Sequence, residues 1–257
     1  GESHAQSIAN EFSARIVLRQ KDIYAPEPVM SVDAAIRKAL ASNSRSGHPI
    51  VLLEHADRMN DSTYILNALL DQNVQRAYVP FLWDTAAAHL AFQAGIGNEI
   101  EVALGGWSSD KAGHRRHHQA QVLAIGRRKF HVSGAMLKGQ QIDLGMTALL
   151  KIRGVMVSVV SNFAFTIDQD VYKVFDLDLK DFDIIVLRSK THFRQYFAAV
   201  ASEILIVDTP DYGPADLTMI PYRRLKTRSV YPLNKSWPPS AVIDQTRNEN
   251  MRLKSSL

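Results

Sequence analysis

Charged and polar side chains cluster directly after a short apolar run, Ile50–Leu53. The segment that follows this run contains Asp57, Arg58, Asn60 and Asp61. Arginine can bind a carboxylate through two parallel hydrogen bonds, and the shorter polar side chains can orient such a group. If the run is a strand of an open α/β sheet, the segment lies at the carboxyl end of that strand, where such sheets bind ligands. These four residues are therefore candidates for substrate binding.

A second candidate segment follows the apolar run Asp183–Leu187. It begins with Arg188 and continues to His192 and Arg194, which fall in the first turn of a predicted helix. Cations are unfavourable at this positive end of the helix dipole, so the pattern indicates that an anionic group lies nearby. Asp84, after the run Ala77–Trp83, and Asp208, after Ile204–Val207, occupy corresponding strand-end positions.

Several of these positions also have a purely structural interpretation. Asp61, Ser62, Asp84 and Thr191 stand where helix N-caps belong, and capping explains each of them without a ligand. Arg58 could equally pair with a neighbouring aspartate of its own loop as a structural staple. The strand-end positions therefore carry both interpretations.

The densest group of histidines is His114-Arg115-Arg116-His117-His118. Imidazoles this close could bind a transition metal, but metal sites need ligands that are fixed by surrounding side chains. The polar segment that precedes the group favours a solvated hairpin loop instead. Contact with phosphate or nucleic acid remains the other interpretation, although no interleaved aromatic residues support it. We therefore name no metal ligand in this chain and expect no bound metal or nucleic acid.

The elements that must position these residues alternate between strands and helices. Apolar runs without polar interruption predict strands buried on both faces, and the helical patterns between them predict parallel strands joined by crossover helices. The middle third differs, because the segments 119–132, 148–153 and 155–160 are too closely spaced for crossover helices and predict antiparallel hairpins. The fold class is therefore α/β, a mostly parallel sheet with an inserted antiparallel β-rich middle section.

Helix boundaries can be predicted at several places. The first helix extends to about Gln20, Ser31 caps the helix that carries Ala35 and Ile36, and a helix begins near Ser62. Gly95 suits the position after the alanine-rich helix that Asp84 or Thr85 begins. Further helices are expected around 170–175 and over 191–202.

The composition excludes several classes of protein. The chain has 257 residues, no cysteine and a formal net charge of +4, with 30 Lys and Arg against 26 Asp and Glu. Disulfides, thiolate zinc sites and cysteine nucleophiles are excluded, and the basic residues are scattered rather than gathered. No apolar stretch is long enough to span a bilayer, and the N-terminus lacks the pattern of a signal peptide, so we expect a cytoplasmic protein.

Several segments, in one order along the chain, resemble the C-terminal part of the MlrC-type (microcystinase C) metallopeptidase family. They span most of the sequence and comprise SVDAAIRKAL (31–40), VLLEHADRMNDST (51–63), LWDTAAAHLAFQAGIG (82–97), LGG (104–106), HFR (192–194), VDTP (207–210), PYRRL (221–225) and YPLN (231–234). Two positions depart from the family pattern. The segment 57–61 replaces a glycine-rich loop, so Arg58 and Asn60 would have to reach a substrate with their side chains, and Arg188 stands where the family commonly has lysine.

The resemblance implies a two-part protein of about twice this length. Its N-terminal part would carry the ligands of a catalytic zinc that activates water for amide hydrolysis. Residues 1–49 would then be a helical lead-in from that N-terminal domain, 50–234 the C-terminal α/β domain, and 235–257 a polar tail. The absence of an initiator Met fits a fragment or a processed chain.

The leading hypothesis is that this chain helps to form the substrate cleft of a zinc-dependent metallopeptidase and is inactive by itself. Arg58 and Arg194 would bind a substrate carboxylate, and His192 would donate a hydrogen bond or proton to the oxyanion or the leaving group. The expected partners are the N-terminal metal-binding domain and a peptide or amide substrate. The alternative is a non-catalytic structural or homodimerisation domain, with Tyr222-Arg223-Arg224 and Trp237-Pro238-Pro239 as interface anchors.

Overall fold

The computed structural model describes residues 1–24, 28–42, 47–226, 230 and 233–234, with the backbone alone at 20–24. The chain divides into two compact units. Val29–Asp216 form the larger unit, which holds the sheet, and Gly1–Pro28 together with Leu217–Leu257 form the other. The smaller unit contains helix α1 (Glu2–Tyr24), which ends beyond the expected Gln20, and the short 3₁₀ helix η2 (Leu217–Met219). The segment 237–239, one of the two predicted interface anchors, lies outside the described residues.

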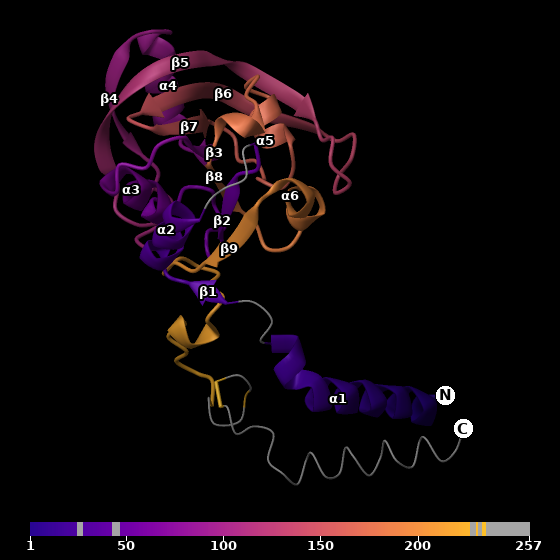
Figure 1. Cartoon of the computed structure of the whole chain (residues 1–257). Helices are drawn as coiled ribbons and strands as arrows, with labels where there is room; N and C mark the ends of the chain where they lie inside the picture. The colour runs from indigo at the N-terminus through magenta and orange to yellow at the C-terminus, as the bar shows by residue number, and fades with distance from the viewer. Residues whose placement is uncertain (25–27, 43–46, 227–229, 231–232, 235–257) are drawn as a thin grey trace. The chain divides into compact units, whose positions relative to one another are not determined.

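Within the described residues, nine strands form one sheet in the order β1-β9-β2-β8-β3-β7-β6-β5-β4 (Figure 1). The pairs from β1 to β7 in this order are parallel, and those from β7 to β4 are antiparallel. The fold class expected from the sequence is therefore confirmed. The strands are β1 (Val29–Met30), β2 (Ile50–Glu54), β3 (Ala77–Trp83), β4 (Glu99–Leu104), β5 (Arg116–His131), β6 (Gln141–Ile152), β7 (Val155–Val160), β8 (Ile184–Arg188) and β9 (Glu203–Val207).

The parallel strands are buried because their sequences are nearly continuous apolar runs. Every residue of β2 and of β8 is buried, as expected for strands that are covered on both faces. Helices α2 (Val32–Ala41), α3 (Tyr64–Asp71) and α4 (Thr85–Ala94) pack their apolar residues into the core on one face of the sheet. The core on the other face includes residues of α5 (Asp170–Lys173), η1 (Leu179–Asp181) and α6 (Arg194–Val200) (Figure 1).

Helix caps follow the sequence at three of the expected positions. Ser31 accepts a hydrogen bond from the Ala34 amide at the start of α2, and Asp84 accepts one from the Ala87 amide at the start of α4. Gly95 ends α4 with φ of 84°, a left-handed value that favours glycine. The cap predictions for Ser31, Asp84 and Gly95 are confirmed.

The antiparallel section is longer than the sequence pattern predicts. β5 begins at Arg116 and pairs with β4 as far as Leu104, and β6 begins at Gln141 rather than at Ala148. The early part of β6 was missed because its polar residues are exposed and do not form an apolar run. The prediction that His114–His118 form a hairpin loop is wrong for His117 and His118, which belong to β5.

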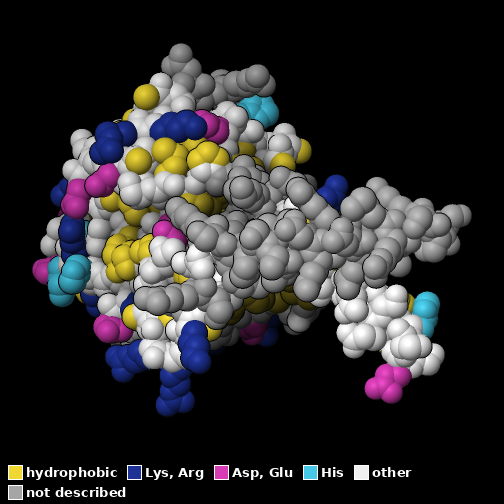
Figure 2. Space-filling view, turned by 90° about the horizontal axis from the view of Figure 1, so that it is seen from below, with side chains coloured by type: hydrophobic (Ala, Val, Ile, Leu, Met, Phe, Trp, Pro, Cys, Tyr) yellow, Lys and Arg dark blue, Asp and Glu magenta, His cyan; other side chains and the backbone are white. Residues whose placement is uncertain are grey.

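The charged side chains on the face seen in Figure 2 are scattered, and no large patch of a single sign stands out. This distribution agrees with the scattered basic residues in the sequence. None of the described helices has the length and apolar character needed to cross a membrane.

Candidate functional site

The candidate site lies at the carboxyl ends of four neighbouring parallel strands, β9, β2, β8 and β3. The register pairs Glu54 at the end of β2 with Arg188 of β8 and with Val207 of β9. The segments that follow these strands therefore start from one edge of the sheet, as the sequence predicted. Open α/β sheets bind their ligands at this edge.

A buried ion network lies beneath this edge. Arg188 Nε lies 2.8 Å from Asp57 Oδ2 and 3.7 Å from Glu54 Oε2, and all three side chains are fully buried. The two terminal nitrogens of Arg188 donate to the carbonyls of Pro80 (3.3 Å) and Ser62 (3.2 Å). One guanidinium thus joins β8 to β3 and to the loop after β2. Buried charges need such partners, because an unpaired one is strongly destabilising.

Glu54 is a fully buried carboxylate of this network, and its pKa is raised. Burial, together with the nearby Asp57 carboxylate, raises the pKa of Glu54 to about 7 against the opposing effects of Arg188, Ser62 and Thr209. Its Oε1 accepts hydrogen bonds from the hydroxyls of Ser62 and Thr209. Among the described residues, Oε2 has no hydrogen-bond partner. Near neutral pH, Glu54 therefore exchanges a proton inside the protein.

Asp57 organises the loop that follows β2. Its carboxylate accepts hydrogen bonds from the amides of Met59 (2.8 Å), Asn60 (2.8 Å) and Ser62 (3.1 Å). Asn60 adopts a φ of 58°, which asparagine tolerates better than most residues. The loop is therefore fixed by a buried carboxylate instead of by glycines, and Arg58 is left exposed.

Asp61 and Ser62 do not cap α3, so this cap prediction is wrong. The N-cap residue of α3 is Thr63, without a side-chain cap. Asp61 instead accepts hydrogen bonds from the amides of Trp107 (3.0 Å) and Ser108 (2.8 Å), and Ser62 donates to Glu54. Asp61 thus connects segments that are distant in sequence, which local patterns cannot reveal.

Asp84 does more than cap α4. Its second oxygen accepts from the Gly105 amide (3.1 Å) and lies 2.9 Å from an Arg115 nitrogen. Together with the contacts of Asp61, these bonds attach the glycine-containing segment after β4 to the strand-end edge. The capping interpretation of Asp84 is confirmed, and its contact with Arg115 adds an ion pair.

A basic cluster of Arg58, Lys190 and His55 lies beside the loop that follows β2. Lys190 Nζ is 2.8 Å from His55 Nδ1 and donates to the Gly213 carbonyl at 2.7 Å. Burial and the neighbouring Arg58 charge lower the pKa of Lys190 to about 8, while burial and Lys190 lower the pKa of His55. A Cβ added to Gly213 would lie 3.0 Å from Arg58 Cδ and 3.3 Å from Lys190 Nζ, and His55 Nδ1 lies 3.2 Å from the Gly213 carbonyl oxygen, so the three side chains surround this glycine. Such a cluster suits an anionic group.

Acidic groups lie on the β9 side of the same edge. Asp208 accepts hydrogen bonds from the amides of Ala215 and Asp216, both at 2.9 Å. Asp211 is buried, and its burial together with Asp57 and Asp61 raises its pKa to about 6. The sequence pattern missed Asp211, because it follows Pro210 in an irregular segment rather than an apolar run.

His192 and Arg194 lie at the start of α6. His192 is exposed and lines a cavity with residues of the β5–β6 connection, and the Arg194 guanidinium carbon lies 5.1 Å from the centre of the Phe193 ring. Thr191 does not cap this helix, whose N-cap residue is Phe193. The structure thus groups Asp57, Arg58, Asn60 and Asp61 in one loop and places His192 and Arg194 on a separate element.

The histidines of the predicted loop have structural contacts. The His114 carbonyl accepts from Thr63 Oγ1 (3.0 Å) and Asn67 Nδ2 (2.9 Å), and His117 Nδ1 lies 3.2 Å from Glu101 Oε1. In the part of the chain that the structure describes, no group of three or more His, Asp or Glu side chains could hold a metal ion.

Comparisons with known proteins match most of this chain. The family described as "MlrC C-terminus" matches residues 59–224. Microcystinase C from Sphingomonas sp. is 20% identical over 210 residues, which are 79% of this chain and 40% of that protein. A crystal structure from Mesorhizobium sp. BNC1, named "Putative metallopeptidase", superposes with a TM-score of 0.69 at 26% identity and covers 80% of this chain and 41% of that one. The chain therefore spans about two fifths of the length of each of these relatives.

Proposed function

Because this chain belongs to the MlrC C-terminus family, we propose that it is the C-terminal domain of a zinc-dependent metallopeptidase or amide hydrolase. The catalytic zinc lies in an N-terminal domain of the same protein, and this chain helps to form the substrate cleft. The similarity to Microcystinase C and to the Mesorhizobium structure supports this proposal, as does the share of each relative that the chain covers.

Zinc in such an enzyme lowers the pKa of a bound water and generates the nucleophile for amide hydrolysis. A catalytic zinc needs three protein ligands, and the described residues of this chain offer no group of that kind. These described residues therefore do not fit the role of zinc ligands. They are assigned to binding and orienting the substrate, and no chemical step on the metal is assigned to them.

The basic cluster carries the substrate-binding role. Arg58 is exposed, and Lys190 and His55 lie beside it around Gly213, so a substrate carboxylate would meet three nitrogen donors. Asp57, Asn60 and Asp61 position Arg58, because their hydrogen bonds fix the loop that carries it. The fixed loop makes binding less costly, since little ordering remains to be done when the substrate arrives.

His192 and Arg194 contribute from the start of α6. His192 is exposed at the edge of a cavity, where its imidazole can donate a hydrogen bond or a proton to the substrate. Arg194 supplies a second guanidinium for a carboxylate. These roles are supported by the exposure of His192 and by the position of both residues after β8.

The decisive observation is the exposed Arg58 on a loop fixed by a buried carboxylate, and kinetics of the full-length protein test it. Arg58→Ala is expected to lower kcat/KM about tenfold, a loss of about 1.4 kcal/mol of transition-state binding. Arg37→Ala is the matched control, because Arg37 is also exposed but lies within helix α2 and not in the loop that follows β2. Equal kcat/KM values for the two variants would contradict the role of Arg58.

A homodimerisation role is the second candidate function. Tyr222 is 39% exposed, and exposed aromatic and arginine side chains are typical interface anchors. Sedimentation of the full-length protein separates the candidates. A stable dimer that Tyr222→Ala dissociates, in a protein without hydrolase activity, would favour this second role.

A further inference from the structure

A cavity of about 150 Å³ lies between the β5–β6 connection, the segment before α5 and the start of α6. Its polar wall includes Asp168, Gln195, Tyr196 and the His192 described above, and its apolar wall includes Met136 and Ile167. The two kinds of wall face one space, so the cavity suits a group that is apolar along its length and polar at its end.

Two buried carboxylates lie here, Asp168 on the cavity wall and Asp170 in the lining of a neighbouring hollow. Asp168 and Asp170 are 6% and 8% exposed, and Asp168 Oδ1 accepts from the Asp170 amide at 3.0 Å. Ser133 donates to Asp170 from its amide and its hydroxyl, both at 2.8 Å. No Lys, Arg or His among the described residues forms an ion pair with either carboxylate.

The surroundings of Asp168 raise the pKa of its carboxyl group. Burial, together with the side chain of Asp170, raises the pKa of Asp168 to about 6. Asp168 therefore holds its proton more strongly than an exposed aspartate does, because it is buried and the carboxylate of Asp170 lies close to it. A cation that enters the cavity would relieve their repulsion.

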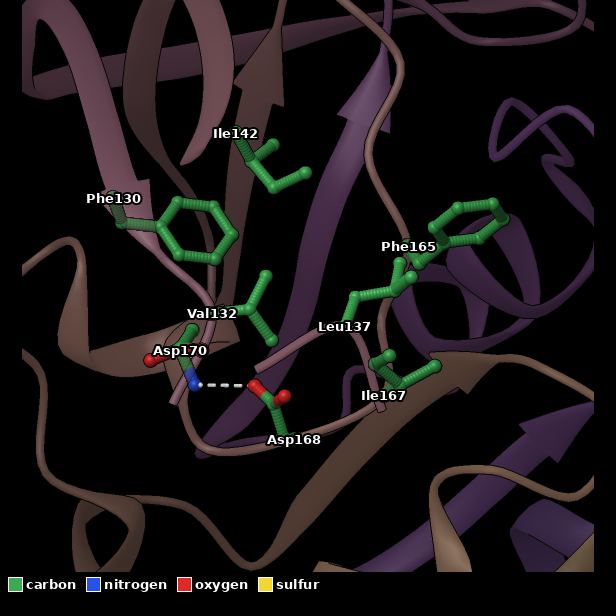
Figure 3. A pocket seen from close by; sticks show the side chains of 8 residues that line it. All are labelled: Phe130, Val132, Leu137, Ile142, Phe165, Ile167, Asp168 and Asp170. Carbon is green, nitrogen blue, oxygen red and sulfur yellow. Dashed lines mark hydrogen bonds between the residues drawn. The ribbon is translucent and has the colours of Figure 1, made fainter. Parts of the chain in front are cut away.

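An apolar hollow adjoins the cavity and shares Ile167 and Asp168 with it (Figure 3). Phe130, Val132 and Ile142 form its inner side. Leu137 and Phe165 also line the hollow although they are 42% and 51% exposed. Large apolar side chains exposed beside a charged cavity are typical of binding sites.

A ligand must match both the charged cavity and the apolar hollow beside it. A metal ion would leave the apolar wall without a role, because hard cations are held by oxygen ligands alone. A Lys or Arg side chain fits better, since its aliphatic stem packs on Met136 and Ile167 while its charged end reaches Asp168. A neighbouring apolar residue of the same peptide would fill the hollow.

We propose that the cavity and the adjoining hollow form a peptide-binding groove that selects a basic residue next to an apolar residue. Asp168 receives the ammonium or guanidinium group, and Phe165 and Leu137 flank the apolar side chain. The inference rests on the proposed function in one respect, which is that the bound peptide is the substrate of the hydrolase.

Binding of labelled peptides tests the groove without any turnover. Fluorescence anisotropy would compare a short peptide that contains adjacent leucine and arginine with the same peptide carrying citrulline, which is neutral and nearly isosteric with arginine. We expect this chain to bind the arginine peptide about tenfold more tightly at neutral pH. Equal affinities, or no binding of either peptide, would overturn the proposal.

Two variants locate the effect. Asp168→Asn keeps the side-chain shape, and we expect it to bind the two peptides with nearly equal affinity. Gln195→Arg places a positive charge at an exposed cavity residue, so it is expected to weaken binding of the arginine peptide without affecting folding. Gln93→Arg, the same change at an exposed position of α4, is the control. If Gln195→Arg and Gln93→Arg bind alike, the site is wrong.

The binding assay and the hydrolase assay can fail separately. Selective peptide binding by a full-length protein without hydrolase activity would refute the proposed function and leave the groove. Hydrolysis that does not distinguish arginine from citrulline, with equal binding of the two peptides, would refute the groove and leave the proposed function.

Discussion

Arg188 Nε lies 2.8 Å from Asp57 Oδ2, and both side chains are fully buried. Asp57 in turn holds the amides of the loop that carries Arg58. The buried pair therefore connects the stability of the sheet to the geometry of the exposed substrate-binding arginine.

Replacement of Arg188 is expected to be strongly destabilising. Arg188→Met leaves the carboxylates of Asp57 and Glu54 buried without their cation, so we expect a loss of about 3 to 5 kcal/mol in the free energy of unfolding. Arg116→Met is the control, because it breaks an ion pair with Asp71 in which both side chains are about half exposed. Denaturant unfolding should show a loss below about 1 kcal/mol for the control. Similar losses in both variants would contradict the importance of the buried network.

Stability should fall as the pH rises through the range where Glu54 titrates. Its pKa is raised from 4.5 to about 7, so between these values the folded protein binds more protons than the unfolded chain. Unfolding therefore becomes easier with rising pH up to about 7, by an amount on the order of 3 kcal/mol from this group. Glu54→Gln should remove this part of the slope when unfolding of both proteins is measured from pH 4.5 to 7. Parallel stability curves would show that Glu54 titrates normally.

Lys190 should lose its proton near neutral pH. Burial and the Arg58 charge lower its pKa to about 8, whereas an ordinary lysine has a pKa of about 10.4. Competitive acetylation followed by mass spectrometry should give a midpoint close to 8 for this residue. Arg58→Ala should shift that midpoint upward, because a neighbouring positive charge is lost. An unchanged midpoint in the variant would mean that the two side chains do not interact.

Asp84 should stabilise the folded protein more than an ordinary helix cap does. Its carboxylate accepts from the Ala87 and Gly105 amides and pairs with Arg115, so Asp84→Ala should cost about 2 to 3 kcal/mol. Ser31→Ala removes a single cap bond of 3.4 Å and should cost about 0.5 to 1 kcal/mol. The comparison uses the same denaturant titration for both variants. Equal costs would show that the bonds to Gly105 and Arg115 add nothing.

The strands of the sheet could be predicted where an apolar run has clear boundaries on both sides. The sequence placed β3 and β7 with the bounds that the structure shows, because both are short apolar runs bounded by polar residues. β1 was missed since two residues, Val29 and Met30, are too few to form a pattern. The helix expected over 191–202 is shorter in the structure, where α6 covers Arg194–Val200.

The site could be predicted only in part. The sequence indicated the loop of Asp57 and Arg58, because charged residues follow a buried strand. It could not show that Asp61 binds the amides of Trp107 and Ser108, since these lie on a loop that tertiary structure brings near. The carboxylate of Asp168 was also missed, because no strand or helix pattern marks the segment before α5, and Asp170 was predicted only as part of the helix around 170–175.

The most direct test measures zinc content and peptide hydrolysis for this chain and for the full-length protein. The account predicts about one zinc per chain and hydrolysis in the full-length protein, and neither in this chain alone. Stoichiometric zinc bound tightly by this chain would contradict the division of roles between the two domains.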